Sequence, residues 1–597
     1  MPLSAQSDEN SEQKQLAELA SQSTWQKLIH LEETDGGTFT TDIVTSGFYL
    51  SQGEFVDPFV ELVHTLNAFA SQPQAGITHS QCLFPARLFW LQSKAPELLS
   101  NLPQVDCPDL LEWKTKTDGR SFHLIHVSGY FANPASAFGH LLIRIGDTEG
   151  GRGLFDTGIN FGAKIPPTDG SMTYVLKGLF GGYTASFSSS EHYLQDHVYS
   201  GTESRDMWAY ELNLTDEQKS LLSLHLWELK DHQFNYFFLR KNCGYRIAQI
   251  LGMVMEVDFI KPHDISYAPI KLFNRLHSEN AVADKKLFSD VNFVPSFQRS
   301  TLKQFQSLSA SEREYALKVL DTQSLDQLEK NLSTDVLDFL LEYLDFRIAT
   351  DTSDKKASHK KFKREVVARR LQRLEKSKPV DTITPLKEPG GGLRPSLARL
   401  SFSSDETTSV EISPYWFGVN DNNRGSLYQS SFKALGLRLD FQSDEVQLDR
   451  LTLLDIQRFA PSKQQVFSGA RLAWGAGAAV IRREGCDDNC IDGELSGGIG
   501  YSSQISDDAL LISRFNSSLT TSLRDQELSF SLASIIDVTS SAKFRWQSGY
   551  RFYTKGLKSD WWHQLELRYA LNRDYAINIG WESDIDDFLE IGVQYKW

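Results

Sequence analysis

The chain has 597 residues, of which 40% are hydrophobic and 23% are charged, and its formal net charge is −16 at pH 7. This length allows several domains, and the composition is that of a folded globular protein. The acidic balance argues against nucleic acid as a partner. No run of about 18 apolar residues occurs, so a transmembrane helix is not expected.

The N-terminal part is predicted to be helical after a polar start. Residues 1–24 are rich in Gln, Ser and Glu, which predicts disorder, and they contain no recognisable signal peptide. Residues 25–108 form a predicted helical domain, because apolar residues recur every three or four positions between Pro58 and Phe69. The sequence therefore leaves open a cytosolic chain or one that begins after a removed signal.

Residues 109–295 have the pattern of an α+β domain. Strand-like runs of apolar residues are separated by loops, and two principal helices are predicted. The second of these helices begins within the stretch 236–252, and its first turn contains Cys243. The unpaired N–H groups and partial positive charge of a helix N-terminus stabilise a thiolate, so this cysteine is a candidate nucleophile.

The next part of the chain is predicted to be a helical connector followed by a linker. Residues 296–378 contain little Gly or Pro and have helix N-cap signals. Their last part is strongly basic, which is typical of a solvated helix face and also of a surface that contacts anionic lipid headgroups. Residues 379–396 are rich in Pro and contain a run of three glycines, which predicts the linker.

The remaining residues, 397–597, have the pattern of an antiparallel β-barrel. Roughly twelve segments of about 10 alternating residues are separated by polar turns, which suits transmembrane strands. The apolar face of the last segment consists of Leu589, Ile591, Val593, Tyr595 and Trp597. Ending on an aromatic residue resembles the C-terminal signature of bacterial outer-membrane barrels. The alternative is a soluble sandwich whose core is the apolar face.

The cysteine count also favours one free thiol. Cys486 and Cys490 bracket three residues between strand-like runs, which predicts a disulfide across a hairpin tip, and Cys82 and Cys107 are a second candidate pair. These pairings leave Cys243 unpaired. The alternative is five reduced cysteines in a cytosolic protein. No CxxC or paired His–Cys spacing occurs, so neither a metal site nor a cofactor is expected.

A nucleophilic cysteine needs a base, a group that orients the base, and donors for an oxyanion. His140 is the preferred base, because it begins an apolar strand and follows small residues that leave room for a substrate. Asn160, on the next strand, is predicted to orient His140, with Asp156 as the second candidate. The alternatives are a packed histidine and a cysteine that packs as a small hydrophobe.

The predicted oxyanion donors surround the cysteine itself. They are the backbone N–H of Cys243 together with its neighbours Asn242 and Gly244. Ser136 and Arg144, at the two ends of the motif around His140, complete the set of predicted substrate-contacting residues.

Four stretches together resemble a known family. They are Ser136–Arg144 (SAFGHLLIR), Gly158–Phe161 (GINF), Arg205–Leu212 (RDMWAYEL) and Tyr236–Arg246 (YFFLRKNCGYR). They look like the Lnb-type periplasmic domain, named for lipoprotein N-acyltransferases that move an acyl chain within the lipidated N-terminal cysteine of a lipoprotein. The order of His before Cys is also similar to permuted NlpC-type papain-like folds, including lecithin:retinol acyltransferase.

The resemblance implies a permuted papain-like α+β catalytic domain with Cys243 as nucleophile, His140 as base and Asn160 on the following strand. The Lnb acyltransferases continue into membrane helices, whereas this chain has a predicted barrel. We therefore expect the reaction class to carry over without the same substrate.

The expected protein is a Cys–His acyltransferase or acyl hydrolase that acts through a thioester on lipid or lipoprotein acyl groups. Its barrel would lie in the bacterial outer membrane and its catalytic domain in the periplasm. The alternatives are a cysteine amidase or peptidase that acts on peptidoglycan, and a non-enzymatic outer-membrane structural protein.

Overall fold

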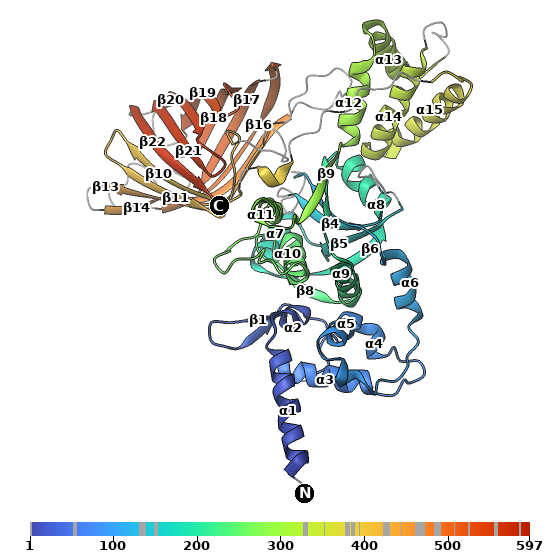
Figure 1. The fold of residues 1–597 in the computed structure, drawn as a ribbon. Coiled ribbons are helices and arrows are strands. Elements are labelled where there is room, and N and C mark those ends of the chain that lie inside the picture. Colours follow the sequence, from blue (N-terminus) through green and yellow to red (C-terminus); the bar gives the residue numbers. More distant parts are fainter. Residues whose placement is uncertain are drawn as a thin grey trace. The chain divides into compact units, whose positions relative to one another are not determined.

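The computed structural model describes residues 3–51, 56–129, 139–147, 153, 155–325, 332–351, 353–376, 383, 388–392, 394–421, 430–442, 445–459, 472–482, 491–506, 508–522, 526–553, 559–583 and 587–597. The chain forms two compact units, Met1–Val127 with Gly139–Ser296, and Ser128–Phe138 with Phe297–Trp597 (Figure 1). Within the described ranges, no helix combines the length and the apolar character that crossing a membrane requires.

The first unit begins with short helices and a small hairpin. These elements are α1 (Leu3–Ala20), α2 (Ser23–Leu28), β1 (Leu31–Glu33), β2 (Phe39–Thr41), α3 (Pro58–Ala70), α4 (Ser80–Leu83), α5 (Pro85–Lys94), η1 (Pro96–Leu99) and α6 (Pro108–Thr117). Helix α1 occupies residues that the sequence predicted to be disordered. Its C-terminal end packs against α3, with Leu19 and Ala20 buried, and this burial offsets the entropy of ordering a polar segment.

The centre of the first unit is an antiparallel sheet with strand order β8-β6-β5-β4-β3-β7-β9. The strands are β3 (Phe122–Val127), β4 (His140–Ile145), β5 (Thr157–Ala163), β6 (Tyr183–Glu191), β7 (Met207–Leu212), β8 (Gln233–Tyr236) and β9 (Phe288–Val294). The helices among them are α7 (Ser171–Phe180), α8 (His192–Asp196), the π-helix η3 (His197–Thr202), α9 (Asp216–Leu229), α10 (Cys243–Val254) and α11 (Pro269–Val282). Strand β4 and helix α10, which carry the predicted base and nucleophile, are in direct contact.

A buried ionic network joins the N-terminal helices to α9. Arg87 lies between Glu61, whose Oε1 is 2.8 Å from its Nη1, and Glu228, and all three side chains are inaccessible to solvent. Glu228 also accepts hydrogen bonds from the backbone N–H groups of Ala86 and Arg87 at 2.7 and 3.0 Å. Buried charges are stable only when they are paired and hydrogen-bonded in this way, so the network fixes the two parts of the unit against each other.

A pair of buried imidazoles continues this network. The Nε2 atoms of His30 and His225 lie 3.1 Å apart, and Nδ1 of His30 lies 3.2 Å from the side-chain oxygen of Gln249 on α10. Burial, followed by the nearby His225, lowers the pKa of His30 well below its ordinary value of 6.5. His30 is therefore neutral in the folded protein at neutral pH.

This burial predicts a loss of stability in mild acid. The unfolded chain binds a proton at His30 more readily than the folded chain does. The free energy of unfolding therefore keeps the full contribution of this site above about pH 6.5 and decreases as the pH falls below that value. We expect the unfolding temperature of the first unit to be lower at about pH 5.5 than at about pH 7.5, and His30→Gln to weaken that dependence. The exposed His64→Gln is the matched control. An equal pH dependence in both variants would contradict this account of His30.

The second unit begins with a helical bundle. Its helices are α12 (Phe297–Ser307), α13 (Ala310–Thr322), α14 (Thr334–Thr350) and α15 (Ser353–Leu371). Their apolar faces meet in one core that includes Phe339 and Leu340 of α14 and Phe362 and Val366 of α15. The basic helix α15 also forms ion pairs with α14, including Arg370 with Asp338.

The C-terminal part is a closed antiparallel barrel of twelve strands among the described residues. They are β10 (Leu397–Ser403), β11 (Thr408–Ser413), β13 (Ser430–Gln442), β14 (Glu445–Arg458), β15 (Leu472–Arg482), β16 (Ile491–Ser506), β17 (Ala509–Thr520), β18 (Glu527–Asp537), β19 (Ala542–Tyr553), β20 (Asp560–Ala570), β21 (Tyr575–Ser583) and β22 (Asp587–Lys596). Pairing of β11 with β13 closes the ring, and the short β12 (Tyr415–Phe417) pairs with β13 beyond the end of β11. The predicted architecture of N-terminal helices, a mixed α+β domain and a barrel of about twelve strands is confirmed.

The alternation of β22 shows which face is outside. Ile591 and Val593 are 48% and 51% exposed, whereas Gln594 and Lys596 are each 1% exposed. In a soluble sandwich the apolar residues would form the core, so the sandwich alternative is wrong. An apolar outer surface and a polar interior are the arrangement of a transmembrane barrel.

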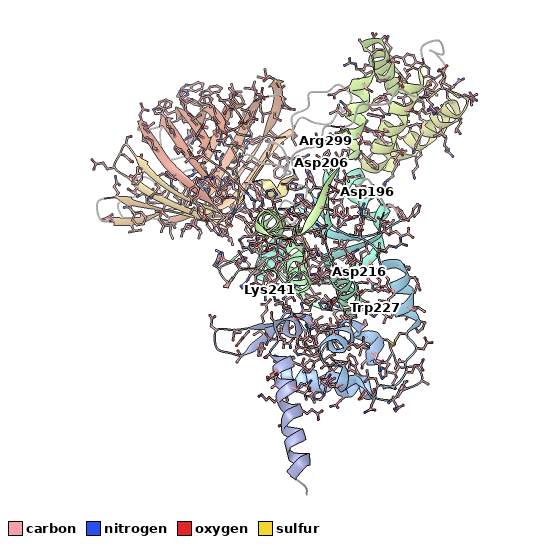
Figure 2. All side chains as sticks on the ribbon, viewed as in Figure 1. Asp196, Asp206, Asp216, Trp227, Lys241 and Arg299 are labelled. Carbon is pink, nitrogen blue, oxygen red and sulfur yellow. A yellow bond between two sulfur atoms is a disulfide. The ribbon has the colours of Figure 1, made fainter. Side chains whose placement is uncertain are left out.

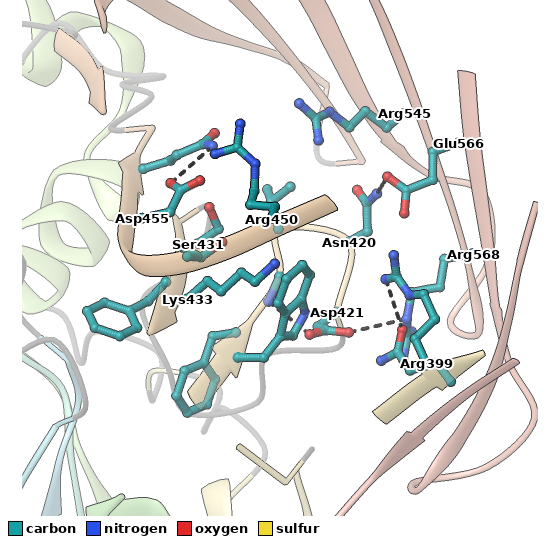
Figure 3. A pocket seen from close by; sticks show the side chains of 18 of the residues that line it. Arg399, Asn420, Asp421, Ser431, Lys433, Arg450, Asp455, Arg545, Glu566 and Arg568 are labelled. Carbon is teal, nitrogen blue, oxygen red and sulfur yellow. Dashed lines mark hydrogen bonds and ion pairs between the residues drawn. The ribbon is translucent and has the colours of Figure 1, made fainter. Parts of the chain in front are cut away.

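The barrel interior contains a charged cavity of about 390 Å³ (Figure 3). The segment after β12 enters it, where Asn420 donates a hydrogen bond to Glu566 at 2.7 Å. The next residue, Asp421, forms ion pairs with Arg568 of β20 and Lys596 of β22, and all three side chains are at most 5% exposed. These buried contacts connect the segment after β12 to strands β20 and β22.

Asp421 should therefore be important for barrel stability. Asp421→Ala leaves two buried cations without their shared carboxylate, which costs about 3–5 kcal/mol when a buried pair is broken. We expect the variant to unfold at a lower temperature in detergent, measured by the heat-dependent mobility of the barrel on gels. Glu445→Ala, at an exposed position on β14, is the control. Equal unfolding temperatures for the two variants would show that the Asp421 ion pairs contribute nothing net.

Candidate functional site

Cys243 is the first residue of α10, as the sequence predicts, and Asn242 caps the helix. The Asn242 side chain accepts a hydrogen bond from the backbone N–H of Tyr245 at 3.2 Å. Its amide nitrogen donates to the carbonyls of Phe238 and Tyr267, at 2.9 and 2.7 Å. The side-chain amide hydrogens of Asn242 thus hold the loop before the helix, and a role of Asn242 near an oxyanion stays a prediction.

The structure brings together the thiol, an imidazole and an amide. Sγ of Cys243 lies 3.4 Å from Nδ1 of His140, and Nε2 of His140 lies 2.6 Å from Oδ1 of Asn160. His140 begins β4, and the pairing of Leu142 with Asn160 places Asn160 diagonally across from His140 on β5. Three residues that are separated by up to 103 positions in the chain thus form one continuous row.

This contact with Asn160 determines which imidazole nitrogen carries the hydrogen. An amide oxygen can only accept, so Nε2 of His140 must donate to Oδ1 of Asn160. Nδ1 then has a lone pair directed at Sγ of Cys243. This is the arrangement that a general base needs in order to remove the thiol proton.

Burial controls the charge of the pair. It raises the pKa of the Cys243 thiol to about 11, against the opposing effect of the backbone N–H groups of Leu141, Gly244 and Cys243 itself. It also lowers the pKa of His140 to about 4, assisted by the nearby Arg205. The pair is therefore a neutral thiol beside a neutral imidazole at pH 7. The expectation that the helix N-terminus stabilises a thiolate is correct in direction, but burial has the larger effect.

Two glycines allow this close packing. Gly139, immediately before His140, has φ +85°, and a Cβ there would lie 2.8 Å from the carbonyl oxygen of Val127. A Cβ on Gly244, immediately after the cysteine, would lie 2.7 Å from Cα of Pro269 on α11. Side chains at these positions would push β4 and α10 away from their neighbours.

Asp156 and Arg144 are not brought to the thiol. Asp156 lies 3.6 Å from Nε of Arg144, so this carboxylate is close to a guanidinium instead of to His140. Arg144 is four residues further along β4 than His140, which is roughly 13 Å at the rise of an extended strand. Ser136, together with Cys486 and Cys490, lies outside the described residues.

Cys82 and Cys107 form a disulfide, and Cys243 is a free buried thiol. The disulfide joins α4 to the residue before α6. The indole N–H of Trp227 on α9, which Figure 2 labels, donates to the Cys82 carbonyl at 2.8 Å. The N-terminal helices thus contact α9 here as well as through the Arg87 network.

The N-terminal hairpin region also contacts the helix that carries the thiol. Asp42 forms ion pairs with Lys241 and Arg246, each at 2.6 Å, and Glu32 accepts a hydrogen bond from Tyr245 at 2.7 Å (Figure 2 labels Lys241). These contacts lie on both sides of Cys243 in the sequence, so they hold the first turn of α10 in position.

Two residues near His140, Tyr199 and Arg205, were not predicted from the sequence. The ring of Tyr199, from the π-helix η3, lies 5.5 Å from the imidazole, and the guanidinium of Arg205 lies 5.3 Å from the Tyr199 ring. No sequence pattern marks a π-helix, although such helices occur often at functional sites. Arg205 begins one of the stretches that carry the family resemblance, which was the available signal.

The two units together define a class of protein. One unit is an α+β domain with a thiol–imidazole–amide row, and the other includes a closed barrel with an apolar outer surface. The protein is therefore a cell-envelope protein that combines an α+β domain with an outer-membrane-type barrel.

Comparison with protein families supports this class. Residues 109–275 match the Lnb N-terminal periplasmic domain, and this range contains Cys243, His140 and Asn160. Residues 17–94 and 394–597 match two families that are each described as a domain of unknown function, DUF7843 and DUF7840. The periplasmic domain and the outer-membrane-type barrel support a location in the cell envelope, at the outer membrane.

Comparison with solved structures finds porins and other outer-membrane proteins that each cover about a third of this chain. None of the curated proteins matches the chain. The KdgM porin in complex with disordered oligogalacturonate is 10% identical, with 34% of this chain and 98% of the porin covered and a TM-score of 0.24. The NanC porin is 11% identical, with 34% and 100% covered and a TM-score of 0.24. Omp33 of Acinetobacter baumannii is 8% identical, with 34% and 96% covered and a TM-score of 0.20.

The cap of α10 should be unusually important for stability. Asn242→Ala removes the cap, worth about 1 kcal/mol, and also leaves two buried carbonyls without donors, at about 1–3 kcal/mol each. Thr215→Ala, which removes the cap of the neighbouring α9, is the matched control. We expect a clearly larger loss of thermal stability for Asn242→Ala. Equal losses would mean that the bonds to Phe238 and Tyr267 contribute nothing beyond ordinary capping.

Proposed function

We propose that this protein is an envelope acyltransferase or acyl hydrolase in which Cys243 attacks an ester or amide of a lipid or lipoprotein. The row from Cys243 through His140 to Asn160 carries the proposal, because its 3.4 and 2.6 Å contacts supply a nucleophile, a base and a group that orients the base. The range that matches the Lnb periplasmic domain contains all three residues, and that family name supports a role in lipoprotein processing.

The first half of the reaction forms a thioester. As Sγ attacks the carbonyl carbon, Nδ1 of His140 takes the thiol proton, and the carbonyl oxygen becomes an oxyanion. The thiol and imidazole are neutral at rest, so this proton transfer accompanies the attack. His140 then gives the proton to the leaving alcohol or amine as the carbon–heteroatom bond breaks, which leaves the acyl group on sulfur.

The second half returns the enzyme to its starting state. An amine or a water molecule attacks the thioester carbonyl while Nδ1 of His140 takes its proton, and the sulfur departs and recovers that proton. Attack by an amine makes the protein a transferase, and attack by water makes it a hydrolase.

Backbone groups are the proposed oxyanion donors. The N–H groups of Cys243, Gly244 and Leu141 all act on the sulfur and favour negative charge there. An oxyanion formed beside the sulfur would be close to the same donors, which are fixed by α10 and β4 and need no rearrangement. This assigns to Gly244 the role that the sequence predicted for it, through its backbone.

A membrane location favours an acyl substrate over a peptide. The apolar outer surface of the barrel supports a position of the barrel in lipid. A periplasmic domain on the same chain is then always close to phospholipid and lipoprotein acyl groups at one membrane face, which raises their effective concentration. We therefore propose a lipid-linked acyl donor.

The proposal predicts that all three side chains are needed. Cys243→Ala should abolish acyl transfer, His140→Ala should reduce it about 10²–10⁴-fold, and Asn160→Ala should reduce it less, since the base remains present. The measurements are the mass of an acyl adduct on Cys243 after incubation with a thiol-reactive lipid ester, and the acylation state of envelope lipoproteins by mass spectrometry.

The control is Asn292→Ala, an exposed asparagine on β9 of the same sheet. Unchanged lipid and lipoprotein profiles in Cys243→Ala, with no adduct in the parent protein, would overturn the proposal. Changed muropeptides with unchanged lipoproteins would instead favour the amidase or peptidase alternative.

A further inference from the structure

Arg205 is a buried cation whose charge acts on the imidazole of His140. Its side chain is 2% exposed, its Nη1 lies 2.7 Å from Oε2 of Glu203, and its Nη2 donates to the carbonyl of Val127 at 3.3 Å. Val127 pairs directly with His140 across β3 and β4, so this hydrogen bond fixes the guanidinium at the strand position of the base. The guanidinium also covers one side of the Tyr199 ring.

We infer that Arg205 tunes the charge of the thiol–imidazole pair in addition to burial: held by Glu203, Val127 and Tyr199, it disfavours protonation of His140 and favours an anionic sulfur at Cys243. This inference rests on the proposed function for its chemical meaning, but the charge effect is a property of the site with or without a substrate. Arg205 is a positioning residue, because it acts through Tyr199, His140 and the local field.

A fixed positive charge affects the two partners in a defined way. It stabilises the thiolate, which lowers the pKa of Cys243, and it destabilises the imidazolium, which lowers the pKa of His140. Two titratable groups also act on this cation: Glu203, which reduces its effect, and the phenol of Tyr199, whose pKa is raised to about 12 mainly by burial and which therefore stays neutral.

These signs match what general-base catalysis needs. Only the unprotonated imidazole can accept the thiol proton, and burial alone would make the sulfur a very weak acid. Arg205 works with burial at His140 and against burial at Cys243. The result is a base that remains available in mild acid beside a thiol that is easier to ionise.

The competing explanation is purely structural. In that account Arg205 only fixes the segment between η3 and β7, and its loss opens the site to water. Water would relieve burial at both groups, which lowers the pKa of Cys243 and raises that of His140. Loss of a positive charge instead raises both pKa values. The direction at Cys243 therefore separates the two explanations.

The test uses the full-length protein in detergent and two chemical probes. The rate at which iodoacetamide alkylates Cys243 reports the thiolate, and the pH dependence of His140 carbethoxylation by diethyl pyrocarbonate reports the neutral imidazole. Both products are quantified by peptide mass spectrometry, and neither measurement requires a substrate. Arg205→Met is compared with Arg205→Lys, which keeps the positive charge.

For Arg205→Met we expect alkylation at about pH 9 to slow roughly tenfold and the His140 midpoint to rise by about one pH unit, since a single nearby charge has effects of this size. Arg205→Lys should stay close to the parent. Glu203→Gln, which leaves Arg205 in place without its carboxylate, should change both quantities in the opposite direction. This second variant alters only a side chain that is 24% exposed, so it tests the inference even if Arg205→Met does not fold.

Faster alkylation in Arg205→Met together with a higher His140 midpoint would overturn the inference in favour of water entry. Unchanged values in Glu203→Gln would also overturn it. Neither result depends on acyl transfer, so failure of this inference and failure of the proposed function are distinguishable.

Discussion

The packing of the first turn of α10 against the start of β4 is the constraint on which the candidate site depends. It places Sγ of Cys243 3.4 Å from the imidazole of His140, and it buries the thiol, while His140 is half-buried. Burial then dominates the electrostatics, because it raises the pKa of the thiol more than the helix donors lower it. The site is consequently neutral at rest, and charge develops in it only when a proton moves from sulfur to imidazole.

The N-terminal helices and hairpin are part of this arrangement. Asp42 and Glu32 contact residues on either side of Cys243, and Arg87 links Glu61 to Glu228 in a network without exposure to solvent. Family models separate residues 17–94 from 109–275, but the physical unit includes both. The N-terminal segment thus holds the first turn of α10, since Asp42 forms ion pairs with Lys241 and Arg246 on either side of Cys243 in the sequence.

The barrel depends on the alternation of apolar and polar side chains along its strands. Each strand alternates apolar and polar residues, and ring closure through β11 and β13 leaves the apolar ones outside. Polar and charged side chains then fill the interior, where Asp421 is paired with Arg568 and Lys596. A membrane solvates the outer face, so the same pattern that would be a core in water becomes a surface here.

The sequence by itself determined the order of helical, α+β and barrel parts, the approximate number of barrel strands, and the helix start at Cys243, and it indicated His140 and Asn160 as candidate neighbours of the thiol. These features are encoded in local periodicity, capping residues and short motifs, which can be read without knowing the fold. Only the tertiary structure decided the separation of Asp156 and Arg144 from the thiol, the use of the Asn242 amide, and the position of Tyr199 and Arg205. Those outcomes depend on which strands become neighbours and on how deeply each group is buried, and neither quantity is present in any single stretch of sequence.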